Sequence, residues 1–213
     1  MVDIKIIQNG ITSLPQNVQD EILKLIEKEE EAQKQVAEKE KQKAEETILM
    51  RKTDTVTQIA AVTESFDPKT MFATGEHDGI KFWHGDNFSK YMFKPATTVN
   101  DVAAQNFTSY ENKRQSYDKD IRAEIGEQVI TPEQLWATWK DLIFKQPKGQ
   151  AGILKTNGYA NVWYVKCYDG IVRAVFCRWN ADNGKWYLSC STLEDVCWSG
   201  KLQFFVSDDD VKA

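Results

Sequence analysis

The chain lacks several features that would assign it to a broad class of protein. No apolar run approaches the roughly 18–20 residues that a membrane-spanning helix needs, so we expect no membrane partner. Residues 1–7 show no basic flank followed by an apolar stretch, so no secretory signal is legible. The net charge of −5 over 213 residues gives no basic footprint, and we therefore expect no nucleic-acid partner.

Catalytic motifs are also scarce. The chain has no nucleophile elbow, phosphate-binding loop or dinucleotide fingerprint, and only two histidines. His77 and His84, with Asp78 and Asp86 beside them, are the candidate ligands for a metal ion, but their spacing fixes no ligand geometry. The same residues are typical of ordinary polar turns. We therefore expect no cofactor, and we keep a metal-dependent enzyme with a site near these histidines as the alternative function.

Aromatic residues are absent from the first 65 positions, although the chain contains 24 of them. The same segment carries 9 basic and 13 acidic residues, a net charge of −4. A segment without aromatic residues and with an excess of charge cannot build a globular core of its own. The composition predicts a helical stalk or oligomerisation segment over residues 1–62 and a globular head over residues 63–213.

Within the first segment, a helix is predicted from Pro15 to about Lys52, because neither Gly nor Pro interrupts this stretch. Apolar residues recur in it at alternating three- and four-residue steps, which is the spacing of a coiled-coil seam. The candidate oligomerisation residues are Val18, Ile22, Leu25, Ala32 and Val36. Charged residues then take the seam positions, so a short coiled coil and a lone solvated helix both stay open. A threonine-rich hinge is predicted at 53–57.

The head divides into three parts by pattern. Residues 66–130 predict short strands followed by a helix from Asn100 to Gly126, because apolar and aromatic residues there recur every three or four positions. Residues 131–146 predict a second helix, since Thr131, Pro132 and Gln134 form a capping box with proline at the first helical position. Residues 155–213 predict an antiparallel sheet.

The turn at Asp169-Gly170 sets the register expected for that sheet. As a two-residue hairpin turn it pairs Cys167 with Val172, and it places Cys167 on the opposite face from Cys177. Three interpretations of the four cysteines (167, 177, 190 and 197) were compared: a zinc site, one disulfide, or buried thiols. The absence of a closely spaced cysteine pair disfavours zinc, and buried thiols are the preferred interpretation.

Tryptophans near strand ends supply the candidate binding site. Trp179, Trp186 and Trp198, with Arg178 beside the first, fall where a ring can be half exposed and can stack on a sugar, a peptide or another subunit. The alternative is that these rings belong to the core, as aromatic residues of sheets commonly do.

Together these patterns predict an α+β protein. A long N-terminal helix is followed by a compact head, in which a small antiparallel sheet or barrel packs on one or two helices. The expected function is that of a non-enzymatic structural or interaction protein that binds a protein partner or itself as a homo-oligomer. Virion components, adaptors and scaffold subunits share this layout. The expected location is cytoplasmic, or within a virion or another large particle.

Overall fold

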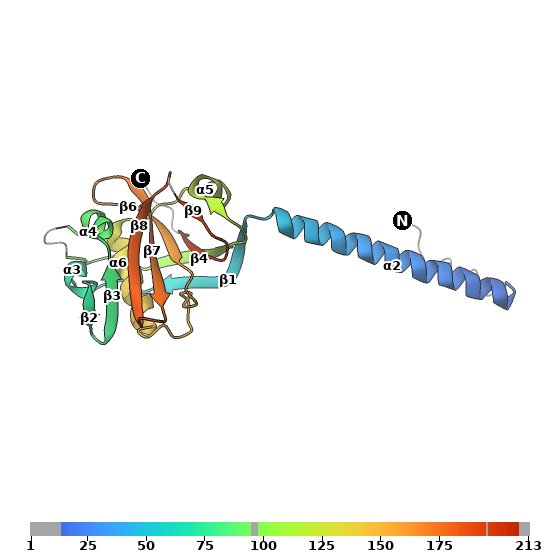
Figure 1. The fold of residues 1–213 in the computed structure, drawn as a ribbon, viewed down its shortest axis with the longest axis horizontal. Helices are drawn as coiled ribbons and strands as arrows, with labels where there is room; N and C mark the ends of the chain where they lie inside the picture. Colours follow the sequence, from blue (N-terminus) through green and yellow to red (C-terminus); the bar gives the residue numbers. More distant parts are fainter. Residues whose placement is uncertain (1–13, 95–97, 195, 209–213) are drawn as a thin grey trace. The chain divides into compact units, whose positions relative to one another are not determined.

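A computed structural model describes residues 14–94, 98–194 and 196–208, except for the side chains of residues 42 and 44–46. Contacts divide the chain into two units, Met1–Ile48 and Leu49–Ala213, which are described separately (Figure 1). In the part of the chain that the structure describes, no helix is both long and apolar enough to cross a membrane.

From residue 14 onward, where the structure describes the first unit, it contains the helix α2 (Gln16–Thr47), of 32 residues. It begins directly after Pro15, whose carbonyl oxygen accepts hydrogen bonds from the backbone N–H of Val18 and Gln19. It ends at Thr47, because Ile48 adopts an extended backbone with ψ of 121°. The long N-terminal helix is thus confirmed, although it ends five residues before the predicted Lys52.

The boundary predicted at residues 62 and 63 is corrected by strand β1 (Met50–Ile59). This strand pairs antiparallel with β4 (Gln105–Asn112), and it buries Leu49, Met50 and Ile59 in the head. The predicted threonine hinge is therefore part of a sheet, where β-branched residues are favoured. The physical boundary lies at Ile48 and Leu49, so the head begins 14 residues earlier than the composition predicts.

The head is built on one mixed eight-stranded sheet with the order β1-β4-β10-β6-β7-β8-β3-β2. Two neighbouring pairs, β10–β6 and β3–β8, are parallel, and the other pairs are antiparallel. The α+β class is confirmed, but the expectation of a small, purely antiparallel sheet or barrel is wrong. The remaining strands are β2 (Gly75–His77), β3 (Ile80–His84), β5 (Ser116–Tyr117), β6 (Asn161–Lys166), β7 (Val172–Asn180), β8 (Lys185–Thr192), β9 (Cys197–Trp198) and β10 (Gln203–Ser207).

The helix predicted from Asn100 to Gly126 is wrong. Its first half is β4, and only the end is helical, as α5 (Asp118–Ile125). β4 lies between β1 and β10, so strands distant in sequence satisfy its backbone hydrogen bonds on both sides. Buried polar side chains support it: the amide of Asn112 donates to the carbonyl of Ser199 at 2.7 Å. Tertiary pairing thus overrides a local apolar periodicity.

One face of the sheet packs on α6 (Pro132–Lys145), together with α3 (Pro68–Met71) and α4 (Asp86–Met92). The predicted capping box is confirmed: Thr131 Oγ1 accepts from the N–H of Gln134 at 3.2 Å, and Gln134 Oε1 accepts from the N–H of Thr131 at 2.8 Å. Trp136 is fully buried and stacks on Phe93 at 5.4 Å and on Phe72 at 5.2 Å. We call the buried side chains on this face of the sheet the α6 cluster. They are Ile59, Phe66, Phe72, Ile80, Phe82, Phe88, Met92, Val99, Val102, Phe107, Ile130, Leu135, Trp136, Ala137, Trp139, Leu142, Ile143, Leu154, Trp163, Val165, Cys167, Val175, Cys177, Trp179, Trp186, Leu188, Cys190 and Phe205.

The opposite face carries a second set of buried side chains, which we call the α5 cluster. Its members lie on α5, at the start of β1, on β6, β7, β9 and β10, and directly before β6 and β10. They are Leu49, Met50, Ile121, Ile125, Ala160, Val162, Tyr164, Ala174, Trp198, Leu202 and Phe204. The apolar character of both faces therefore reflects a sheet that is covered on both sides.

The hairpin of β6 and β7 differs from its predicted register by one residue. Lys166, not Cys167, pairs with Val172, because the loop has three residues and ends in Gly170 with φ of +81°. Such a loop combines a turn with a glycine bulge. A slip of one residue exchanges the faces, so Cys167 and Cys177 both belong to the α6 cluster, contrary to the prediction.

Candidate functional site

The three predicted tryptophans are buried rather than half exposed. Trp186 is fully buried, and Trp179 and Trp198 each retain 7% of their exposure. Trp179 and Trp186 pack against each other in the α6 cluster, with ring centroids 5.5 Å apart. Trp198 lies in the α5 cluster, so the three rings form no common surface patch. Of the predicted binding residues, only Arg178 is exposed.

A different tryptophan is exposed on the same sheet, beside a half-buried tyrosine. Trp83 of β3 is 41% exposed, and it lies directly beside Tyr187 of β8 in the parallel pair. Tyr187 in turn lies directly across from Arg178 of β7 in the antiparallel pair. These three residues therefore form one row across three adjacent strands, which we call the aromatic strip.

Tyr187 is the centre of the aromatic strip. Its ring centroid lies 5.1 Å from that of Trp83, with the two rings tilted by 46°. The guanidinium of Arg178 lies 5.6 Å from the Tyr187 ring, and the ammonium of Lys185 lies 5.4 Å from it. The side-chain amide of Asn183 donates to the Tyr187 hydroxyl at 3.4 Å. These contacts hold the ring in place while its neighbours reach solvent.

The charge around the aromatic strip is positive. Among the described residues, no carboxylate lies within ion-pair distance of Arg178 or Lys185. Lys81, two residues before Trp83 on β3, has a single weak ion pair with Glu76 at 3.8 Å. The strip thus contains two rings and the cation of Arg178, and Lys185 and Lys81 lie beside it. The net charge of the whole chain is −5.

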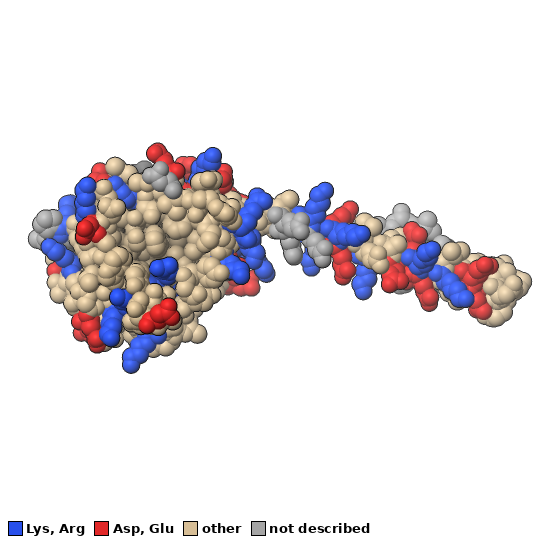
Figure 2. Space-filling view, viewed as in Figure 1, with Lys and Arg blue, Asp and Glu red and all other residues tan. Residues whose placement is uncertain are grey.

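The strip is exposed because the cover of this face ends along β7. Ala174 is fully buried in the α5 cluster, Phe176 is half-buried against Trp198, and Arg178 is exposed. In Figure 1, α6 lies behind β3, β7 and β8, and no helix lies in front of them. Figure 2 shows a broad surface over these strands with only isolated charged side chains. The face is therefore open to a ligand at this end of the sheet.

In β8 the sequence reasoning selected the buried member of an alternating pair, Trp186, rather than its half-buried neighbour Tyr187. In β8 the buried residues Trp186, Leu188 and Cys190 alternate with the more polar Lys185, Tyr187, Ser189 and Ser191. Alternation of this kind places the second set on the open face. The same alternation separates buried Phe82 from exposed Trp83 in β3. The signal was present in the sequence, but only the pairing of β3 with β8 brings Trp83 to Tyr187.

The candidate metal ligands do not converge. Within the described ranges, no group of three His, Cys, Asp or Glu side chains is arranged to hold a metal ion. Asp78 forms the β2–β3 turn with φ of +52°, and Asp86 lies in the first turn of α4. His84 Nδ1 hydrogen-bonds Ser89 Oγ at 2.8 Å, and burial lowers the pKa of its imidazole. His77 and His84 are thus the last residues of β2 and β3, whereas Asp78 lies in a turn and Asp86 at a helix terminus.

All four cysteines are free thiols. Cys167, Cys177 and Cys190 are buried, and Cys197 is half-buried. Burial raises the pKa of the Cys190 thiol to about 12 and also raises that of Cys177. The thiolate is the reactive form of cysteine, and the raised pKa keeps Cys177 and Cys190 as neutral thiols. These two side chains are therefore small apolar members of the core.

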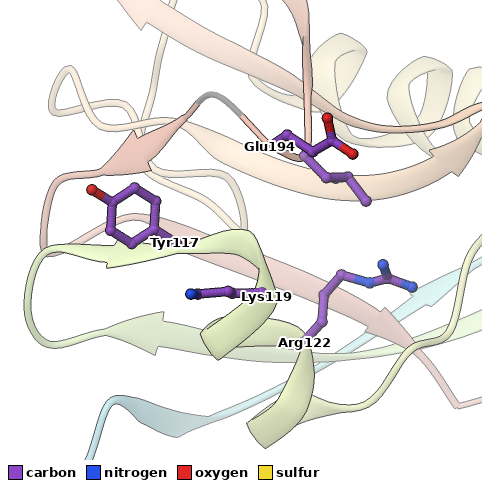
Figure 3. Close-up of a pocket in the computed structure, with 5 residues that line it drawn as sticks. Tyr117, Lys119, Arg122 and Glu194 are labelled. Carbon is purple, nitrogen blue, oxygen red and sulfur yellow. The ribbon is translucent and has the colours of Figure 1, made fainter.

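A cavity of about 400 Å³ opens beside α5. It is lined by Tyr117, Lys119, Arg122, Leu193 and Glu194. Figure 3 shows that the Lys119 side chain extends toward Tyr117, whereas the Arg122 side chain extends away from it. The two cations therefore do not converge on one ligand group.

Asp118, which lies between the lining residues Tyr117 and Lys119 in the chain, is fully buried. Its Oδ1 accepts hydrogen bonds from the Tyr164 hydroxyl at 2.7 Å and from Trp198 Nε1 at 2.8 Å. Burial raises the pKa of this carboxyl, and the two hydrogen bonds and the nearby Arg122 partly oppose that shift. Asp118 ties α5 to β6 and β9, which is a structural role.

The predicted oligomerisation residues lie along α2. Val18 and Ile22 are half-buried, whereas Leu25 is 63% exposed and Val36 is 56% exposed.

No protein-family model, curated protein or solved structure matches this chain.

Proposed function

We propose that this protein is a non-enzymatic interaction protein that self-associates through α2 and presents its head to a partner. The observation that supports it is the apolar stripe of α2. Leu25 and Val36 are large apolar residues that are more than half exposed, and they share heptad spacing with Val18 and Ile22. Exposed apolar side chains at this spacing are typical of a helix that pairs with another helix.

Burial of these side chains supplies the driving force for association. Each fully buried aliphatic side chain contributes about 1.5–3 kcal/mol relative to exposure. Glu29 occupies one seam position, and Lys39 and Lys43 occupy two later positions. We therefore place the self-association contact between Val18 and Val36, before the first of these lysines. The partner in this contact is a second copy of this chain, whose α2 carries the same apolar stripe.

Such an arrangement fits a virion component, an adaptor or a scaffold subunit, in the cytoplasm or within a larger particle. In this proposal, α2 sets the number of copies and the head supplies the surface for a further protein partner. The enzyme alternative at His77 and His84 receives no support from the arrangement of the described side chains, which form no group of three metal ligands.

The experiment is sedimentation of the full chain over a wide range of concentrations. We expect the parent to sediment above the monomer mass and the Ile22→Asp variant to sediment as a monomer, because a charge in the seam cannot be buried without a partner. Ala37→Asp introduces the same charge outside the seam, and this control variant should keep the parent mass. A parent that stays monomeric at every concentration would remove the proposal.

A further inference from the structure

We propose that the aromatic strip binds single-stranded nucleic acid, with a base stacked on Trp83 and phosphates beside Arg178 and Lys185. This inference goes beyond the proposed function and does not rest on self-association through α2. It also replaces the sequence-based expectation of no nucleic-acid partner, which was drawn from net charge alone.

The first support is the exposure of the Trp83 ring. Trp83 is a large side chain that is 41% exposed on a sheet whose other tryptophans within the described strands are buried. Bases stack on exposed aromatic side chains regardless of sequence, and each such contact is a substantial part of single-strand binding. A row of side chains on open strands is a suitable platform, because adjacent strands are only about 4.8 Å apart.

The second support is the charge beside the rings. The cations of Arg178 and Lys185 both lie against the Tyr187 ring, and no described carboxylate pairs with either of them. A neutral sugar or a proline-rich peptide would use the rings but would leave these cations without an anionic partner. A nucleotide offers a flat base and a phosphate together, so it uses both groups of side chains.

The third support is the geometry of the row. Arg178 lies two strands away from Trp83, with Tyr187 between them. Two strand spacings amount to roughly 10 Å, which a single nucleotide spans from its base to the phosphate of its neighbour. Lys81 lies two residues before Trp83 on β3. The backbone of a single-stranded nucleic acid that crosses the row would pass this side chain.

The overall negative charge of the protein does not oppose this contact at physiological salt. Charges separated by more than about 8 Å in solvent are largely screened at that ionic strength. The nearest charges therefore dominate, and around the strip these include Arg178, Lys185 and the ion pair of Lys81 with Glu76. With three phosphate contacts at most, we expect modest affinity with a salt dependence of the association constant near a slope of −2 on a double logarithmic plot.

The test is fluorescence anisotropy of a labelled oligothymidylate titrated with the full chain over a range of salt concentrations that includes about 0.15 M. We expect Trp83→Ala to weaken binding by about 10-fold or more, and Trp83→Phe to restore part of it, since phenylalanine keeps a ring for stacking. We expect Arg178→Gln to reduce the magnitude of the salt slope by about 0.7, the value for one lost phosphate contact.

Matched controls come from the cavity beside α5. Tyr117→Ala removes a ring that is 49% exposed, and Lys119→Gln removes an exposed cation, so both should keep the parent affinity. Thermal melting of each variant reports whether it remains folded. Because Trp83 and Arg178 are exposed, neither substitution should lower the melting temperature appreciably.

Three results would overturn the proposal. The first is no binding of the oligothymidylate by a folded parent protein. The second is equal binding of inorganic polyphosphate with no effect of Trp83→Ala, which would indicate charge without stacking. The third is Trp83-dependent binding of a neutral oligosaccharide or a proline-rich peptide in place of the oligonucleotide, which would assign the strip to that class.

Discussion

The helix α2 and the sheet of the head obtain their order from different sources. Residues 1–65 contain none of the 24 aromatic residues, and α2 depends on helix-forming residues and on pairs of opposite charges one turn apart. The head instead buries two aromatic clusters on the two faces of one sheet. Local interactions thus define α2, whereas contacts between distant segments define the head, and the two regions should respond differently to substitution.

The largest expected effect is the loss of β1. A chain that starts at Leu49 should melt cooperatively, because it keeps every strand of the sheet. A chain that starts at Thr63 should show no cooperative transition, because it lacks Met50, Ile59 and the strand that covers one edge of β4. Near-ultraviolet circular dichroism during heating measures this. Equal melting of the two chains would show that the head does not need β1.

The next effect is expected at the centre of the α6 cluster. Trp136 packs on Phe72, Phe88, Phe93 and Trp139, so Trp136→Ala should lower the free energy of unfolding by about 3–5 kcal/mol. Urea denaturation measures the change. A loss below 1 kcal/mol would mean that the cluster repacks around the missing ring.

A smaller effect concerns pH and Asp118. Burial raises the pKa of this carboxyl in the folded state, so the folded state holds its proton at a pH where the unfolded chain has lost it. Stability from this group is therefore greatest at low pH and is lost as pH rises from the unfolded value near 3.9 through the raised pKa. The slope reaches at most about 1.4 kcal/mol per pH unit for one proton.

The variant Asp118→Asn removes the titrating group but keeps an oxygen for Tyr164 and Trp198. The difference in unfolding free energy between the parent and this variant, measured in urea across that pH range, should fall as pH rises. A difference that is constant or increases with pH would contradict the raised pKa. Asp120→Asn, an exposed residue in the same turn, is the control.

The smallest effect is expected on α2. Leu25 is 63% exposed, so Leu25→Ala should change the free energy of unfolding of the head by less than about 0.5 kcal/mol. Denaturation monitored by tryptophan fluorescence isolates the head, because every tryptophan lies beyond residue 65. A large loss would show that the stability of the head depends on α2.

The features predicted correctly depend on residues close together in the chain. The capping box at Thr131 places α6 because both of its hydrogen bonds span three residues. The absence of Gly and Pro places α2 for the same local reason. The helix predicted over 100–126 failed because β1 and β10, far away in sequence, pair with both edges of β4.

The candidate site shows the same division. The alternation of β8 is local, and it separates Trp186 from Tyr187 without knowledge of the fold. The residue count of the β6–β7 loop is not specified by Asp169-Gly170 alone, because a two-residue turn and a three-residue turn with a glycine bulge both accept that pair. One residue of difference exchanged the faces and brought Cys167 to the side of Cys177.

The sequence by itself determined a charged, aromatic-free helix followed by an aromatic head, because composition and short-range spacing decide whether a segment can form a core. Only the tertiary structure decided that β1 belongs to the head and that the exposed tryptophan is Trp83 rather than Trp179, Trp186 or Trp198. Exposure depends on which strands are neighbours and on where the helices end over the sheet. Those contacts join residues about 100 positions apart, as in the pair Trp83 and Tyr187, and no local pattern encodes them.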